Sequence, residues 1–205
     1  MTDVGSRARE AFPSLQVTLI AMVVAIALES LVGHLQEIDA AFALTVESLV
    51  IWLQGIFVLQ LAVYLWVAYA VLAFLAWWSM RWVDFMAPFF LGVVVFALIA
   101  LIGTARIDAW FALNGLGFVT GTWVFLRNVA LAASNPDNGY FNDARYRRGA
   151  AALLGSLGAV NLLGAALVGL LATSWLAVLI LVIENALIAG ASVVWIRWWT
   201  RTTET

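Results

Sequence analysis

The chain alternates long apolar runs with short polar segments. Six runs approach the length of about 20 residues that an α-helix needs to cross a bilayer. They cover residues 14–34, 46–76, 85–103, 110–132, 150–172 and 175–199. The longest connection between them, residues 133–149, contains the turn signals Asn135-Pro136 and Asn138-Gly139. This pattern predicts an all-α fold in which residues 1–205 form one transmembrane domain, a bundle of six helices.

The composition points to the same class of protein. Hydrophobic residues make up 65% of the chain and charged residues 11%, and the mean hydropathy is +1.02. Soluble domains usually contain about 25% charged residues. A water-soluble fold of this composition would have too little polar surface to cover its apolar interior. We therefore expect a polytopic integral membrane protein whose immediate partner is the lipid bilayer, and we expect no nucleic-acid partner.

The basic residues predict how the helices are oriented. All ten are arginines. If the N-terminus is cytoplasmic, only Arg106 falls on the outer side, and the cytoplasmic side receives Arg7, Arg9, Arg81, Arg127, Arg145, Arg147, Arg148, Arg197 and Arg201. This asymmetry is the positive-inside pattern. It predicts a multi-pass protein of the cell membrane with both termini and the connection 133–149 in the cytoplasm. Trp52, Trp110 and Trp175 are then expected at the outer membrane interface.

Several residue types that metal sites and active sites require are missing. The chain has no cysteine and a single histidine, His34. These absences exclude thiolate metal sites, and they exclude sites that need several histidines of one chain. We expect no metal and no cofactor. Because the chain also lacks lysine and paired aspartates, we expect that it is not an enzyme.

Small and polar residues recur on one face of four spans. Such stripes let helices approach closely and hydrogen-bond to one another inside a membrane. We expect them to face the interior of the bundle, and we expect the third span, which has no stripe, to face lipid. The stripes are Ala21, Ala25, Glu29 and Gly33; Asn114, Gly117, Gly121 and Asn128; Gly158, Asn161, Ala165 and Gly169; and Ala177, Glu184 and Ala191, with Asn185 beside them.

Glu184 stands out because it interrupts the apolar segment "VLILVIENALIAG", residues 178–190. It follows Trp175 by about 14 Å of helix, which places it near the middle of the bilayer together with Asn161. By the same reasoning Glu29, Asn114 and Gln54 lie in the outer third. A charged carboxylate at the bilayer centre costs at least ~3 kcal/mol, and the sequence places no basic residue at that depth.

Three explanations for Glu184 remain open. Glu184 and Glu29 could line a pathway for protons or cations, with Asn161, Asn185, Asn114 and Gln54 along it. Glu184 could instead be a neutral hydrogen-bonding clasp to Asn161, or it could contact a second subunit or a bound cofactor. We expect a homo-oligomeric cation or proton channel, or a small transporter. The alternative is a non-catalytic accessory or assembly subunit of a larger membrane complex, with other membrane subunits as its partners.

Two charged clusters lie outside the spans. Glu37, Asp39 and Glu47, with His34 beside them, could form an outer acidic vestibule that concentrates cations. They could equally be acids tolerated in an exterior loop, with His34 as a hydrogen-bonded cap. On the cytoplasmic side, Arg145, Arg147 and Arg148 could contact lipid phosphates or simply determine the topology.

Overall fold

The computed structural model describes residues 4–75, 82–133, 144–171 and 173–203. Within these ranges every regular element is helical. The elements are α1 (Val4–Glu37), the short 3-10 helix η1 (Asp39–Phe42), α2 (Val46–Leu75), α3 (Trp82–Leu101), α4 (Ile107–Ala133), α5 (Ala144–Leu171) and α6 (Ser174–Thr203). The fold of the described residues is therefore all-helical.

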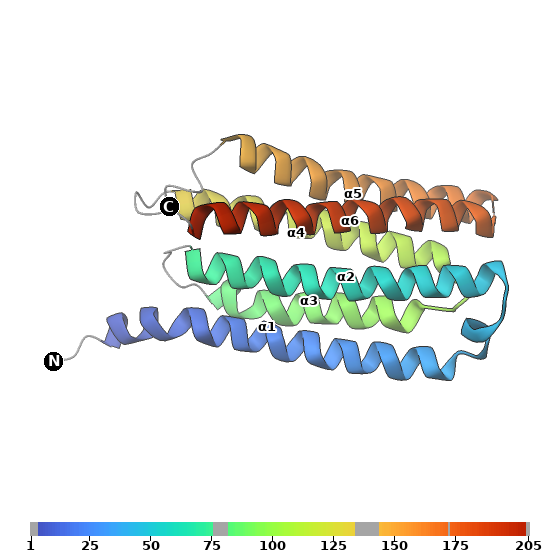
Figure 1. Ribbon diagram of the computed structural model, residues 1–205, viewed down its shortest axis with the longest axis horizontal. Helices are drawn as coiled ribbons and strands as arrows, with labels where there is room; N and C mark the ends of the chain where they lie inside the picture. The colour runs from blue at the N-terminus through green and yellow to red at the C-terminus, as the bar shows by residue number, and fades with distance from the viewer. Residues whose placement is uncertain (1–3, 76–81, 134–143, 172, 204–205) are drawn as a thin grey trace.

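The helices run side by side along one common axis (Figure 1). α1 lies at one edge of the bundle and α5 at the opposite edge, with α2 between α1 and α6. α1 begins and α6 ends at the same end of the bundle, where α2 and α4 also end. The chain therefore runs the length of the bundle an even number of times.

Five of the described helices contain stretches long and apolar enough to cross a membrane. These stretches are Ser14–Glu37, Val46–Ala70, Ile107–Ala130, Arg147–Leu171 and Ser174–Val194, and α3 contributes the shorter apolar stretch Pro88–Leu101. Large apolar side chains also cover the outside of the bundle, for example Val93 and Leu163, which are 65% and 63% exposed. A surface of this kind suits contact with lipid better than contact with water. The architecture is compatible with a multi-pass membrane protein.

An aromatic cluster joins α2 to α4 in the core. Phe57, Trp110 and Phe111 are completely buried. The Trp110 ring packs edge-to-face against Phe57 at 5.5 Å and against Phe111 at 5.3 Å between ring centroids, a geometry that aromatic pairs favour. Trp110 lies in the first turn of α4, near one end of a span, but its indole fills the space between two helices and does not reach the outside of the bundle.

Glycines allow α4 and α5 to pack closely along their length. A Cβ atom on Gly115 would lie 2.8 Å from Cγ of Leu162, and one on Gly158 would lie 3.2 Å from Cγ2 of Val119. The first distance is too short for real Cβ contacts, so this crossing requires glycine at position 115. Close approach at small residues is the usual way in which membrane helices associate.

Local hydrogen bonds determine where α2 begins. The Ser48 backbone N–H donates to Thr45 Oγ1 at 3.2 Å, and the Thr45 N–H donates to Ser48 Oγ at 3.4 Å. This reciprocal pair is a capping box with serine in place of the usual Glu or Gln. The Trp52 indole N–H donates to the Ala41 carbonyl at 2.8 Å and so holds η1 against the first turns of α2.

Three further expectations from the sequence need correction. α5 begins at Ala144, so residues 144–149, expected in a loop, are helical. α3 was expected to face lipid, but its residues Val95, Leu98 and Ile99 are buried, because α3 packs against α1, α2 and α4. The stripe on α1 was expected to face the interior, yet Ala25, Glu29 and Gly33 are exposed.

Candidate functional site

Glu184 lies in the inward-facing seam of α6. The residues that share this seam, Ala177, Leu181, Ile188 and Ala191, are apolar and at most 2% exposed. Their spacing of three and four residues places them on one helix face, which confirms that the stripe on α6 faces inward. Glu184 is itself 0% exposed. The sequence thus places a carboxyl group where the helix otherwise presents only hydrocarbon.

The Glu184 carboxyl group has no hydrogen-bond partner among the described residues. Both of its oxygens, Oε1 and Oε2, are buried and unbonded. The ion pair found in the described part of the chain joins Arg106 to Asp108, at 3.5 Å between Nε and Oδ1, and both side chains are well exposed. Glu184 therefore lacks the compensation that a buried polar group normally has.

Asn114 and Asn161 form a buried bridge between α4 and α5. The Asn114 side-chain amide donates to Asn161 Oδ1 at 2.8 Å, and the Asn161 amide donates to the Leu157 carbonyl at 2.8 Å. Asn114 is 2% exposed and Asn161 0%. Asn161 is thus bonded to Asn114, and the clasp between Asn161 and Glu184, one of the three explanations left open by the sequence, is not formed.

The helix register places Glu184 at the level of this bridge. A Cβ on Gly164 of α5 would lie 3.2 Å from Cδ1 of Ile180 on α6, so these two positions face each other. α5 and α6 are antiparallel (Figure 1). Asn161 lies three residues before Gly164 on α5, and Glu184 lies four residues after Ile180 on α6. Because the helices are antiparallel, both steps lead toward the same end of the bundle, so Asn161 and Glu184 lie at about the same height.

Next to Glu184, Asn185 forms a hydrogen bond from α6 to α2. Its side-chain amide donates to the Leu53 carbonyl at 3.2 Å and to the Leu181 carbonyl at 2.8 Å, while its Oδ1 is buried without a partner. Gln54, the residue after Leu53, is 2% exposed. We call Gln54, Asn114, Asn161, Glu184 and Asn185 the buried polar layer. It draws residues from α2, α4, α5 and α6.

Glu29 does not belong to this layer. It lies on α1, which packs on α2 and α3, whereas Glu184 lies on α6, on the other side of α2 (Figure 1). The Glu29 side chain is exposed. The structure thus separates the two carboxylates that the sequence analysis placed on one pathway.

The acidic cluster lies at the end of the bundle opposite the termini. Glu37, Asp39 and Glu47 are exposed there, and the described residues contain no group of three side chains that could hold a metal ion. His34 is half-buried, and its Nε2 is 3.1 Å from the Ile102 carbonyl. His34 therefore bonds to the residue that follows the end of α3, as the cap interpretation expects.

The arginines proposed to contact lipid lie at the start of α5. Arg147 is half-buried and Arg148 is exposed, and neither forms an ion pair within the described residues. The side chain of Arg145 lies outside the part of the chain that can be described. The two described side chains are therefore available to an external anion.

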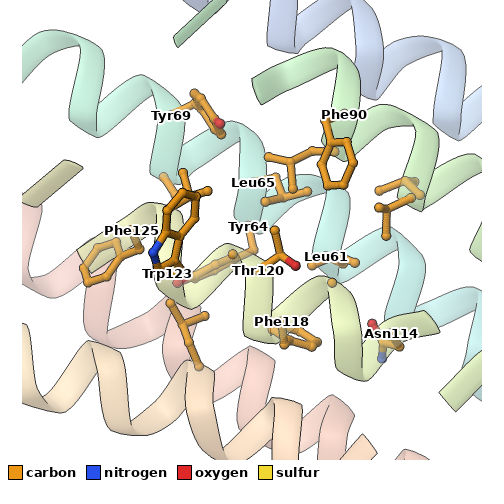
Figure 2. A pocket seen from close by; sticks show the side chains of 18 of the residues that line it. Leu61, Tyr64, Leu65, Tyr69, Phe90, Asn114, Phe118, Thr120, Trp123 and Phe125 are labelled. Atoms are coloured by element: carbon orange, nitrogen blue, oxygen red, sulfur yellow. The ribbon is translucent and has the colours of Figure 1, made fainter. Parts of the chain in front are cut away.

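Sequence reasoning missed a cavity between α2, α3 and α4. Its volume is about 390 Å³. Figure 2 shows side chains from these helices around a common space, with Asn114 toward one end and Trp123 toward the other. The stripe on α4 was a signal for it, because Asn114, Gly117, Gly121 and Asn128 all line the cavity. The small residues on this face leave the space open.

A second missed feature is the Trp110 indole. Its Nε1–H is buried without a hydrogen-bond acceptor among the described residues. No sequence signal predicted this, because a tryptophan close to a helix start is typical of a membrane interface.

No family model matches the chain, and no curated protein or solved structure is significantly similar to it.

Proposed function

We propose that the protein transports protons or small cations across the membrane and that Glu184 is the group that binds them. The observation that carries this proposal is a fully buried carboxyl group with two unbonded oxygens in an apolar bundle. An ionised carboxylate in such surroundings is costly. It becomes stable when it takes up a proton or a cation, and binding of this kind is what a transport site needs.

The packing around Glu184 favours a transporter that changes conformation over a permanently open channel. The carboxyl group has no exposed surface, and the bonded pair Asn114 and Asn161 lies at about the same level of the bundle. A path to Glu184 from either end therefore requires helices of the bundle to move relative to each other. The paired asparagines would act as a closed gate in this cycle.

Flux measurements in proteoliposomes test this function. The parent protein, Glu184→Gln and Glu29→Gln are reconstituted at equal amounts, and proton and potassium fluxes are measured under imposed gradients. We expect flux in the parent and in Glu29→Gln, because Glu29 lies outside the buried polar layer, and loss of flux in Glu184→Gln. Undiminished flux in a correctly folded Glu184→Gln would overturn the role of Glu184. No flux in the parent under any gradient would overturn transport itself.

A second candidate function is that of a subunit within a larger membrane assembly. The exposed face of α1 favours it, because Glu29 lies within an apolar span and faces outward. A charged side chain exposed to lipid at such a position is unfavourable. Ala25 and Gly33 on the same face would allow another helix to approach closely. A homo-oligomer formed through α1 is compatible with transport, whereas a contact with unlike subunits supports the accessory role.

Disulfide trapping distinguishes these assemblies. The chain contains no cysteine, so Ala25→Cys introduces a single thiol, and Leu179→Cys on the exposed face of α6 is the matched control. Efficient disulfide dimers of Ala25→Cys in native membranes, with none for the control, support a homo-oligomer through α1. Absence of dimers, together with copurification of unlike membrane proteins, supports the accessory role.

The proposal extends to location and orientation. We propose that the protein lies in the cell membrane with six spans and with both termini in the cytoplasm. The arginine distribution supports this orientation, and it agrees with the even number of passes along the bundle.

A further inference from the structure

We propose that the cavity between α2, α3 and α4 is a binding site for one acyl chain of an anionic phospholipid, whose headgroup lies beside Arg127. This site is separate from Glu184 and does not depend on the proposed transport function. It rests on the lining, the length and the opening of the cavity, and on the charge at one end of it.

The lining suits a hydrocarbon chain. Leu61 and Leu65 of α2, Phe90 and Val94 of α3, and Phe118 of α4 contribute to the walls. The volume of about 390 Å³ is not filled by protein side chains, and an empty apolar space of this size forgoes the packing contacts that a bound chain would supply. Water is a poor occupant, because few polar groups converge on this space.

The cavity is long enough for an acyl chain that crosses one bilayer leaflet. It follows α4 from Asn114 to Asn128, which at about 1.5 Å per residue is roughly 21 Å of helix. Half of a hydrocarbon core of about 30 Å is roughly 15 Å. A chain entering at the Asn128 end could therefore extend through its leaflet and end near Asn114.

The cavity opens sideways, where a lipid could enter without leaving the membrane. Phe90, Thr120 and Trp123 line it and are also exposed on the outside of the bundle. These residues come from α3 and α4, so the opening lies between those two helices. Figure 2 shows Phe90 and Trp123 on different sides of the space.

Charge at the Asn128 end favours an anionic headgroup. The Arg127 guanidinium lies 5.6 Å from the ring centroid of Trp123, which lines the cavity. Arg127 is exposed and forms no ion pair with any described residue. Arg147 and Arg148 lie at the same end of the bundle, at the start of α5 (Figure 1). A phosphate beside Arg127 would supply the missing counter-charge.

Photo-crosslinking with a labelled lipid tests the site. The probe is phosphatidylglycerol with a diazirine at the end of one acyl chain, incorporated with the full-length protein into phosphatidylcholine nanodiscs. After irradiation, mass spectrometry locates the adducts. We expect adducts on α3 and α4 residues that line the cavity, enriched over the exposed α6 residues Leu179 and Val193, and we expect unlabelled phosphatidylglycerol to displace them.

Two glycine variants test whether the labelled lipid binds inside the cavity. A Cβ added at Gly121 or at Gly190 would meet no atom within 4 Å, so neither substitution creates a clash at Cβ. Gly121 lines the cavity, whereas Gly190 lies on the exposed surface of α6. We expect Gly121→Leu to remove the cavity adducts and Gly190→Leu to leave them unchanged. If Gly121→Leu fails to fold, displacement by unlabelled lipid in the parent protein decides the question.

The headgroup is tested by Arg127→Gln, with Arg106→Gln at the opposite end as the control. An arginine near the surface is expected to favour the anionic lipid by about fivefold. We expect the diazirine-labelled phosphatidylglycerol to be preferred over its phosphatidylcholine counterpart by about this factor, and only Arg127→Gln to remove the preference. Adducts spread evenly over all exposed faces, or equal labelling by both lipids in the parent protein, would overturn the proposal.

Discussion

Glu184 occupies a place where the surrounding packing would accommodate an apolar side chain. Its neighbours in the seam of α6 are buried and apolar, and both of its oxygens lack partners. Removing a polar group that makes no hydrogen bond avoids a desolvation cost. The packing of the fold therefore does not account for the carboxyl group, whereas the proposed role in binding would.

The first prediction concerns this residue. Methionine is similar to glutamate in length, is somewhat larger and has no strongly polar atom. We therefore expect Glu184→Met to keep or raise the midpoint temperature of unfolding in detergent. We expect the same variant to lose transport. Thermal unfolding and flux are measured on the same preparation. A clear fall in the midpoint temperature would contradict this prediction and favour the neutral clasp.

The Asn114–Asn161 bridge gives a second prediction at this scale. A double-mutant cycle with Asn114→Ala and Asn161→Ala should give a coupling free energy of about 0.6–2 kcal/mol, the range found for hydrogen bonds between membrane helices. The matched control pairs Asn161→Ala with Asn128→Ala, because Asn128 lies away from the bridge on the same helix. Coupling near zero in the first cycle, or equal coupling in both, would show that the bridge does not form in the membrane.

The sequence predicted which of these residues are buried but not which of them bond to one another. Asn114, Asn161 and Glu184 were expected inside from their spacing, and they are buried. The partner of Asn161 depends on the axial register between α4 and α5. The contacts at Gly115 and Gly158 determine that register. The hydropathy of a single helix carries no information about such contacts.

At the scale of the helices, the spans were predictable and their inward faces only partly so. Long apolar runs predicted every α-helix, because a bilayer requires them. In lipid, however, the outer face of a helix is as apolar as its buried face. Hydrophobic periodicity therefore could not show that Val95 and Leu98 of α3 point inward, or that Glu29 and Gly33 of α1 point outward.

The contact between α4 and α5 gives the third prediction. A methyl group at Gly115 would lie 2.8 Å from Cγ of Leu162 and 3.1 Å from its backbone nitrogen, so the helices must separate. We expect Gly115→Ala to destabilise the protein by about 1–3 kcal/mol, the usual cost of overpacking. Gly155→Ala is the matched control, because a Cβ there meets no atom within 4 Å, and it should be neutral or slightly stabilising. Equal effects of the two substitutions on unfolding would contradict the observed crossing.

At the scale of the whole molecule, the polar features are arranged by depth. Exposed acids lie at one end, where Arg106 is paired with Asp108, and the buried polar layer crosses the interior. Arg127, Arg147 and Arg148 lie at the other end. This order follows from which connections carry the charges, because the acids lie around η1 and the arginines lie at the end of α4 and the start of α5. It means that a cation moving through the protein would meet acidic groups first on one side and arginines on the other, so transport is expected to depend on direction.

The last prediction tests this arrangement across the membrane. Leu44 lies between η1 and α2 and is fully exposed, and Gly149 is exposed near the start of α5, at the opposite end of the bundle. Because the chain has no cysteine, Leu44→Cys and Gly149→Cys each introduce one thiol. In intact cells, a membrane-impermeant maleimide should label Leu44→Cys, whereas it should label Gly149→Cys only after permeabilisation. Labelling of both thiols from outside would show that the two ends of the bundle do not face opposite sides. Labelling of Gly149→Cys but not of Leu44→Cys in intact cells would agree with the bundle but would show the opposite orientation, with the acidic cluster in the cytoplasm.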